Sequence, residues 1–239
     1  MRIFSNIRFI SRHISNLHRM ANNVVSIDEN HLIDRCVTIL KNHGVLAVPT
    51  DTIYGLAALV SSEQGVRRIY QIKGRTFTKP LAISVGDVND LFTWSKPTLS
   101  NEQLSTGDLL PGPVTLMFER HSSLPSYFNP HVNNVAIRIP NCPWIIELAR
   151  RLQEPLALTS ANISNELSTI SIDEFQPLWS EVDLVVDGGT LASNDRRGST
   201  IVDLSQPGYY HIQRHGIDCQ RIIDYLKEHC HLKERQPVA

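Results

Sequence analysis

Polar and cationic side chains gather in this 239-residue sequence at the predicted ends of strands and helices. They are Thr50, Asp51, Thr52, Tyr54, Lys73, Arg75, Lys79, Thr115, Arg138, Ser160, Asn162, Ser199, Thr200 and Arg214. Open α/β sheets bind their ligands at such ends. Lysine and arginine pair with phosphate and carboxylate oxygens, and hydroxyl and amide groups donate further hydrogen bonds. The set therefore predicts a site for a polyanion, and a nucleoside triphosphate fits it better than nucleic acid.

Some of these residues, taken singly, have a structural explanation. Lys73 ends a predicted helix, where a cation stabilises the helix dipole. A single buried arginine such as Arg138 is often half of a structural ion pair. The helix dipole does not explain Arg75, which follows a glycine that should turn the chain. The motifs GxxxxGKS/T, GxGxxG, HExxH and GxSxG are absent from the sequence, so the chemistries that they support are not predicted.

Charge is distributed unevenly along the chain. Residues 1–25 hold four of its 23 Lys and Arg and none of its 24 Asp and Glu, so the remainder has a net charge of −5. General nucleic-acid binders neutralise phosphates with basic side chains, so this balance leaves room only for a local basic groove. No apolar run approaches the roughly 18 residues of a membrane-spanning helix, so we expect no stable membrane insertion.

The first 25 residues are predicted to be a mitochondrial targeting segment. Apolar residues recur at helical spacing from Ile3 to Leu17 among Arg and Ser, without acids, which is typical of a transit peptide. The alternative is a disordered or membrane-surface basic helix. Initiation at Met20 would give a cytosolic form, so we expect both cytoplasmic and mitochondrial protein.

Four scattered cysteines, none in a CxxC pair, argue against a disulfide framework and favour a reducing compartment. His229, Cys230 and His231 adjoin one another, but zinc needs four converging ligands. We therefore expect a helix end there, and no resident metal site in the chain.

Helix and strand patterns alternate from residue 26 to residue 230, which predicts one α/β domain followed by a tail at 231–239. The first helix is expected to start at a Ser26–Glu29 capping box and to stop at Gly44. Further helices are predicted over 62–73, 88–94, 143–153 (with Asn141 as its cap), 174–179 and 217–229, and strands over 45–49, 54–60, 81–85, 114–119, 135–139, 155–158, 183–187, 199–204 and 209–214. The hairpin-like spacing at 199–214 favours a mixed sheet.

Six short motifs follow one another in the chain: PTDTIYGLA, KGR with KPLA, PGPVTL, VAIRIP, LTSANIS and GSTIVD. Each motif is weak alone, but the six in this order are specific, and together they resemble the YrdC family of threonylcarbamoyl-AMP synthases. The resemblance runs from about Val45 to Gly216. The chain is similar to the single-domain form of the family, as found in animals.

The resemblance implies a reaction, a fold and partners. L-Threonine, bicarbonate or CO2, and ATP would give threonylcarbamoyl-AMP and pyrophosphate, with Mg²⁺ accompanying ATP. A tRNA threonylcarbamoyl-transferase complex would then modify adenosine 37 of tRNAs that read ANN codons, and weak tRNA binding by this chain is compatible with that role. The implied fold over residues 26–230 is a single α/β domain with a twisted, open mixed sheet flanked by helices, whose concave face is positively charged.

The resemblance also implies roles for individual residues. The family's catalytic tetrad matches Lys73, Arg75, Ser160 and Asn162, which would also contact ATP. Thr115, Ser168 and Arg214 fall where further nucleotide contacts are expected. Threonine is expected to contact Thr50, Arg138, Ser199 and Thr200, with Arg138 paired to its carboxylate. Asp51 is a candidate base for the threonine amine, unless water suffices.

The chain departs from the family pattern at Ser84, where many members carry His, and at Gly198, Ser164-Asn165 and Arg214-His215-Gly216. None of these departures alters the tetrad. A non-catalytic RNA-binding module on the same concave face is the alternative, which the acidic body disfavours. Hydrogenase-maturation carbamoyltransferases contain a related domain, but they need further modules for which this chain has neither the length nor the cysteine pairs.

Overall fold

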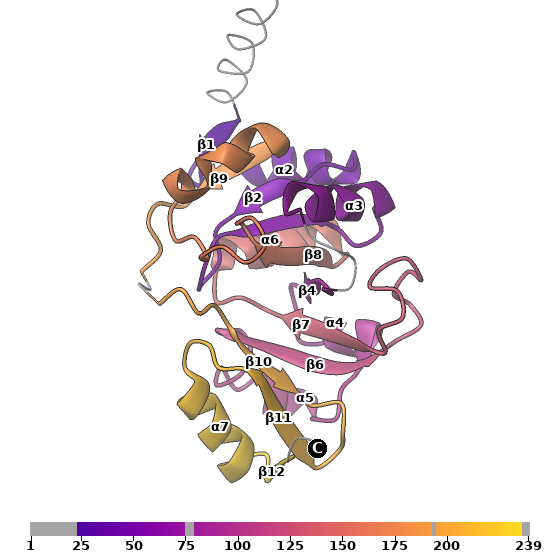
Figure 1. Ribbon diagram of the computed structural model, residues 1–239. Helices are drawn as coiled ribbons and strands as arrows, with labels where there is room; N and C mark the ends of the chain where they lie inside the picture. Colours follow the sequence, from indigo (N-terminus) through magenta and orange to yellow (C-terminus); the bar gives the residue numbers. More distant parts are fainter. Residues whose placement is uncertain (1–22, 75–78, 193–194, 236–239) are drawn as a thin grey trace, which may run out of the picture.

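The computed structural model describes residues 23–74, 79–192 and 195–235. These residues form one sheet of 12 strands (Figure 1). Its order is β1 (Val24–Ser26), β9 (Leu184–Asp187), β2 (Leu46–Val48), β3 (Gly55–Leu59), β8 (Leu156–Ser160), β4 (Ala82–Ser84), β7 (Asn134–Arg138), β6 (Val114–Arg120), β10 (Thr200–Asp203), β11 (Tyr209–Arg214) and β12 (Lys233–Glu234), with β5 (Ser95–Lys96) paired to β6. Strands β2, β3, β8 and β4 pair antiparallel, whereas β4–β7 and β6–β10 pair parallel, so the predicted mixed sheet is confirmed.

Helices cover both faces of the half of the sheet that contains β2, β3 and β8. On one face, α2 (Leu32–Lys41) and α6 (Pro143–Leu152) share a buried apolar cluster with Leu156 and Leu158 of β8. The residue between these two, Ala157, belongs to the cluster on the other face, because successive side chains of a strand point to opposite faces. This two-sided burial explains why these strands are continuous apolar runs in the sequence.

The other face is covered by more helices. They are α3 (Glu63–Ile72), α4 (Asp90–Trp94), α5 (Asn101–Leu104), the 3₁₀ helix η1 (Ile172–Glu181) and α7 (Cys219–Glu228). Each contributes buried side chains, such as Ile69, Leu91 and Ile222, to the larger apolar cluster. The face packed by α2 and α6 is left open over β4, β7, β6 and β10, and that opening is where the candidate site lies (Figure 1).

Two helix starts differ from the prediction. Ser26 ends β1 and pairs with Asp187 of β9, so the predicted capping box is wrong, and α2 begins after His31 in a left-handed conformation. Strand pairing over a long sequence separation outweighs the local capping signal there. The residue before α6 is Cys142, so the prediction that Asn141 caps this helix is wrong, and the Asn141 N–H donates instead to the Asp51 carboxylate at 2.9 Å.

The sequence patterns did not predict β1, β5, α5 or β12, which are too short to show a period. Strand β12 lies in the segment predicted as a tail and pairs with β11, so that part of the tail is ordered structure. Residues 1–22, which hold most of the predicted targeting segment, lie outside the described residues. None of the helices in the described ranges has the length and apolarity needed to cross a bilayer.

Candidate active site

A cavity of about 270 Å³ opens on the face of the sheet that α2 and α6 leave uncovered. Six of the side chains predicted to bind substrates line it, and they come from widely separated segments. They are Thr50, Thr115, Arg138, Ser160, Ser199 and Arg214. Apolar side chains of β4, β6, β7, β8 and β10 complete the wall, among them Ala82 and Met117. The sheet thus gathers in one place the hydroxyl and cationic groups that the sequence suggested.

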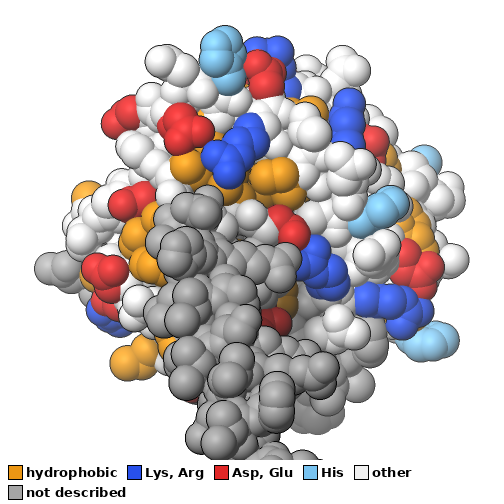
Figure 2. All heavy atoms as spheres, turned by 90° about the horizontal axis from the view of Figure 1, so that it is seen from above, with side chains coloured by type: hydrophobic (Ala, Val, Ile, Leu, Met, Phe, Trp, Pro, Cys, Tyr) orange, Lys and Arg blue, Asp and Glu red, His pale blue; other side chains and the backbone are white. Residues whose placement is uncertain are grey.

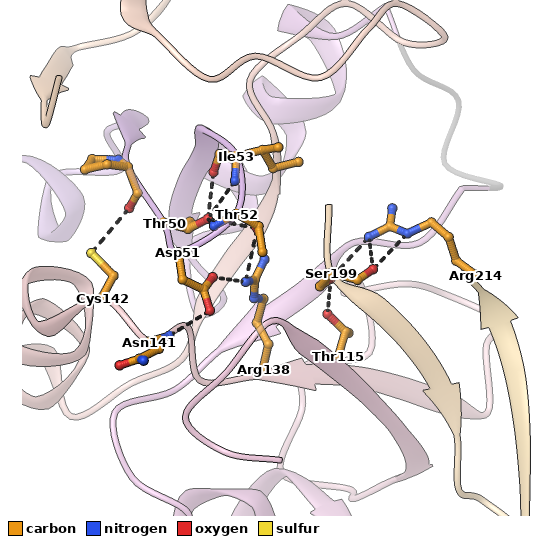
Figure 3. Close-up of polar contacts among 11 residues, drawn as sticks. Thr50, Asp51, Thr52, Ile53, Thr115, Arg138, Asn141, Cys142, Ser199 and Arg214 are labelled. Atoms are coloured by element: carbon orange, nitrogen blue, oxygen red, sulfur yellow. Dashed lines mark hydrogen bonds and ion pairs between the residues drawn. The ribbon is translucent and has the colours of Figure 1, made fainter. Parts of the chain in front are cut away.

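The turn between β2 and β3 is organised by the Thr50 hydroxyl. That oxygen accepts the N–H groups of Thr52 and Ile53, each at 3.2 Å, and donates to the Ile53 carbonyl at 2.6 Å (Figure 3). A threonine that bonds its own backbone in this way stabilises a tight turn. The turn presents the buried Thr50 side chain at the cavity wall.

Arg138, at the end of β7, makes a buried ion pair with Asp51 of this turn. Its Nη2 donates to Asp51 Oδ1 at 2.5 Å, and the side chains are 7% and 8% exposed. Burial lowers the pKa of Arg138, and the Asp51 carboxylate offsets part of that shift. Arg138 Nε is buried without a hydrogen-bond partner among the described residues. An unpaired donor of a buried cation is costly, so it is suited to an anionic ligand.

A second cluster faces the first across the cavity (Figure 3). Thr115 Oγ1 and Ser199 Oγ are 2.8 Å apart, and Arg214 donates to the Ser199 carbonyl through Nε at 3.1 Å and Nη2 at 2.8 Å. Burial lowers the pKa of Arg214, and the positive charge of Arg138 lowers it further. Two arginines that raise each other's electrostatic energy in one cavity favour an anion between them.

Lys73 is buried at the C-terminal end of α3 and reaches the end of β8. Its Nζ donates to the carbonyls of Ser160 at 2.5 Å and Asn162 at 2.6 Å. The side-chain oxygens of the same two residues lie 3.4 and 3.3 Å from Nζ. Three members of the predicted tetrad are therefore together, and neutral oxygens orient the ammonium group without cancelling its charge. The fourth member, Arg75, lies outside the described residues.

Of the predicted site residues within the described ranges, Lys73, Asn162, Ser168 and Thr200 do not line the cavity, and neither does Ser84. Thr200 is fully buried, donates to the Ile217 carbonyl at 2.8 Å and accepts the Gly216 N–H at 3.1 Å, so the geometry gives no support to its predicted contact with threonine. Ser168 is half-buried, and its carbonyl accepts a hydrogen bond from Arg196 at 2.8 Å. The Ser84 hydroxyl is buried without a partner among the described residues.

Comparison with known families identifies the family that shares this site. The Sua5/YciO/YrdC family model, described as "Telomere recombination", matches residues 38–216, about three quarters of the chain. The chain belongs to the Sua5/YciO/YrdC family. The matched residues include every described residue that lines the cavity, so the family's shared segment builds this site.

Individual members of the Sua5/YciO/YrdC family agree with this assignment. A human threonylcarbamoyl-AMP synthase is 44% identical over 196 residues, which span 80% of this chain and 70% of the relative. The mouse threonylcarbamoyl-AMP synthase is 42% identical over 196 residues, 80% of this chain and 69% of the relative. A crystal structure of Pyrococcus abyssi Sua5 complexed with L-threonine superposes with a TM-score of 0.78 at 24% identity, over 89% of this chain and 62% of that one, and shows that the fold is shared.

Tyr54 is among the polar residues singled out in the sequence but has no predicted role there, and the structure supplies one. Tyr54 lines the cavity and is fully buried. Its hydroxyl donates to the Gly189 carbonyl at 2.7 Å and accepts the Gly188 N–H at 3.0 Å. Burial raises the pKa of Tyr54 to about 12, so the hydroxyl keeps its proton at neutral pH. Tyr54 thus ties the β2–β3 turn to the segment after β9. Tyr54 belongs to the PTDTIYGLA motif, so this motif supplies both the turn and its link to the segment after β9.

The cavity lining bears on the predicted Mg²⁺. No carboxylate lines the cavity among the described residues, and within those ranges no three His, Cys, Asp or Glu side chains converge as a metal site. Mg²⁺ prefers phosphate and carboxylate oxygens and retains several waters. This lining therefore fits Mg²⁺ only as an ion carried by the phosphates of ATP.

Proposed function

We propose that this chain is a threonylcarbamoyl-AMP synthase, which makes threonylcarbamoyl-AMP and pyrophosphate from L-threonine, bicarbonate or CO2, and ATP. Both mammalian relatives carry the name of this enzyme at 42% and 44% identity. The observation that carries the assignment is the cavity in which the Arg138 and Arg214 clusters face each other beside Ser160. These relatives favour the catalytic function over the RNA-binding alternative.

Threonine is assigned to the end of the cavity at Arg138. The free Nε–H of Arg138 supplies a donor for the carboxylate, and Thr50 lies beside it on the cavity wall. Because the Thr50 hydroxyl donates to Ile53 and accepts two N–H groups, its part in this proposal is to hold the turn against the bound threonine. Bound L-threonine in the Pyrococcus Sua5 structure, which has the same fold, supports this choice of substrate.

The triphosphate is assigned to the Lys73, Ser160 and Asn162 side, with Arg75 as a further cation. Lys73 is suited to a point-charge contact with phosphate, and arginine to a two-pronged one. Thr115, Ser168 and Arg214 add nucleotide contacts in this proposal. The cavity volume of about 270 Å³ lies just below the roughly 300–1,000 Å³ of small-molecule pockets, so in this proposal part of ATP lies outside the cavity, on its open side.

The reaction needs groups that stabilise negative charge, and these side chains can supply them. The threonine amine combines with CO2 to give a carbamate, whose oxygen attacks the α-phosphorus, and pyrophosphate leaves. Negative charge grows on the α-phosphate oxygens and on the leaving group, where fixed cations and hydroxyl donors stabilise it. Mg²⁺ bound to ATP supplies charge neutralisation for the leaving pyrophosphate. Holding both substrates in one cavity removes the entropic cost of bringing them together.

Asp51 is a poor general base in this arrangement. Oδ1 accepts from Arg138 at 2.5 Å and Oδ2 accepts the Asn141 N–H at 2.9 Å, so both carboxylate oxygens are occupied. Its role is to orient and neutralise Arg138. Water is then the acceptor of the amine proton.

The product defines the partner. Threonylcarbamoyl-AMP is a mixed anhydride that water hydrolyses, so it has to reach an acceptor quickly. A tRNA threonylcarbamoyl-transferase complex that modifies adenosine 37 of ANN-decoding tRNAs is the consumer in this proposal. Basic and acidic side chains are interspersed among the described residues on the face in Figure 2, so these residues form no uniformly basic patch there for tRNA.

We also propose that the protein is present in mitochondria and in the cytoplasm. Residues 1–25 have the composition of a mitochondrial transit peptide, and initiation at Met20 would remove most of them. Fluorescent fusions of the full chain and of a form starting at Met20 test this. The full chain is expected in mitochondria, and the shorter form in the cytosol. A full-length fusion confined to the cytosol would contradict the targeting proposal.

One assay tests the function. The full chain is incubated with Mg²⁺, ATP, bicarbonate and each of several amino acids, and pyrophosphate and the acyl-adenylate are measured. Threonine is expected to stimulate pyrophosphate release far more than serine or valine, and only with bicarbonate present. If threonine does not stimulate ATP cleavage, the proposed function is wrong, and RNA binding with a steep salt dependence would then support the RNA-binding alternative.

A further inference from the structure

Arg196, three residues before Ser199, joins two separate segments outside the cavity lining. Its Nη1 donates to the Ser168 carbonyl at 2.8 Å and to Glu174 Oε2 at 2.7 Å. Its Nη2 donates to Glu174 Oε1, also at 2.7 Å. The pair is therefore bidentate, the arrangement in which an arginine fixes a carboxylate most firmly.

Glu174 extends this connection on its own side. Its Oε2 accepts the Ile170 N–H at 2.9 Å, and the Ile170 carbonyl accepts the Leu191 N–H at 2.8 Å. The segment 168–174 is thus bonded to the β9–β10 connection at two places, Leu191 and Arg196. We call this set of contacts the Glu174–Arg196 clamp: the two side chains and the main chain of Ser168, Ile170 and Leu191.

The clamp connects the two sides of the candidate site. Ser160 and Asn162 lie on the same continuous segment as Ser168, and the Asn162 amide stiffens that segment by donating to the carbonyls of Ile163 at 2.9 Å and Glu166 at 2.8 Å. Ser199 follows Arg196 after two residues and holds Arg214. A shift between the two segments would therefore change the spacing between the Lys73 side and the Ser199 side.

Isolated surface ion pairs contribute little to stability, but the clamp is not of that kind. Its two side chains are 35% and 30% exposed, Arg196 also bonds the main chain of Ser168 in the other segment, and Glu174 accepts the Ile170 N–H of its own segment. The adjacent Arg197 offers a contrast. Its side chain is 60% exposed, and its ion pair is with Asp195, two residues before it.

We propose that Glu174 and Arg196 are positioning residues of the synthase, which set the distance between the Lys73 side and the Ser199–Arg214 side of the cavity. The inference rests on the proposed function, because that distance matters for catalysis only if two substrates react there. Reacting atoms have to approach to about 3–3.5 Å, so a small displacement of one side weakens both binding and reaction.

The test compares Glu174→Gln, Arg196→Gln and Arg196→Lys with the matched control Arg197→Gln. Steady-state rates give kcat and the KM values for ATP and threonine. Glu174→Gln and Arg196→Gln are expected to raise both KM values about tenfold, the effect of about 1.4 kcal/mol. Arg196→Lys keeps the charge but loses the two-pronged contact, so its KM values should lie between those of the wild type and of Arg196→Gln. Arg197→Gln is expected to behave as the wild type.

Hydrogen exchange on the substrate-free protein gives a readout that does not depend on activity. The amides of Ile170 and Leu191 are expected to exchange faster in Arg196→Gln than in the wild type and in Arg197→Gln. Unchanged exchange with unchanged KM values overturns the proposal, and so does a lowered melting temperature with both KM values retained. If the wild type shows no threonine-dependent pyrophosphate release, the proposed function is wrong, and so is the catalytic role of the pair. Hydrogen exchange at Ile170 and Leu191 would still show whether the clamp holds the two segments together.

Discussion

Arg138 and Asp51, 87 residues apart in the sequence, form a buried ion pair at 2.5 Å that joins the end of β7 to the turn after β2. The pair neutralises one oxygen of Asp51, while the Asn141 N–H satisfies the other. One donor of Arg138, Nε, is buried without a hydrogen-bond partner among the described residues. The pair is thus both a structural link across the site and the means by which an arginine is held in a water-poor cavity.

Asp51→Asn is expected to destabilise the fold by about 3–5 kcal/mol, because it leaves a buried guanidinium without its counter-charge. Urea unfolding measures this change. Asp34→Asn is the matched control, since Asp34 is 59% exposed and its contact with Arg151 is 3.6 Å long. That control should change stability by about 0.5 kcal/mol or less. Equal stability of Asp51→Asn and wild type would show that the pair is not a structural link.

Lys73→Ala is expected to lower threonine-dependent pyrophosphate release by at least about 100-fold, the loss typical of a donor that stabilises transition-state charge. The substitution also leaves the Ser160 and Asn162 carbonyls without their ammonium partner. Circular dichroism and the melting temperature check that the fold survives. Lys41→Ala, at the exposed end of α2, is the control and should retain full activity. Full activity of Lys73→Ala would remove Lys73 from the catalytic set.

Arg214→Lys is expected to act much like Arg214→Gln. Arg214 uses Nε and Nη2 together on the Ser199 carbonyl, and a lysine cannot reproduce that two-pronged contact. Both variants should raise the KM for ATP by about tenfold. Arg221→Lys is the control, because Arg221 is a partly exposed arginine of α7 that does not line the cavity. Full rescue by lysine would mean that only the charge of Arg214 matters.

Alkaline pH is expected to destabilise the protein through Cys36. Burial raises the pKa of this thiol from 9.0 to about 12. The unfolded chain therefore loses the thiol proton at a lower pH than the folded chain does. The stability that the neutral thiol contributes is complete below about pH 9 and is lost as the pH rises toward 12, with a slope of up to about 1.4 kcal/mol per pH unit.

Urea unfolding of wild type and Cys36→Ala at pH 8 and pH 10.5 measures this contribution. The substitution creates a small cavity and lowers stability at both pH values, but the fall between them should be smaller than in wild type. Tyr54, whose pKa burial also raises to about 12, keeps part of the slope in both proteins. Identical slopes would contradict the assignment of the alkaline loss to Cys36.

Much of the scaffold could be predicted from the sequence, because its signals are local. Strands β2, β3, β6, β7 and β8 follow apolar runs, and α3 begins at Ser62, which caps it by accepting the Gly65 N–H. The Ser26 prediction failed for the converse reason. Its local signal indicated a helix cap, whereas pairing of β1 with the distant β9 made it the end of a strand.

The sequence by itself determined which residue types the site would hold, and the order of its motifs determined the family. Only the tertiary structure decided which of these side chains meet. Ser199 lines the cavity and its neighbour Thr200 does not, because successive residues of an extended chain point to opposite sides, and the register with β6 selects the side. The contacts of Arg138 with Asp51 and of Arg196 with Glu174 depend on strand pairing between distant segments. No local pattern encodes them, because the free energy that fixes them comes from packing the whole sheet.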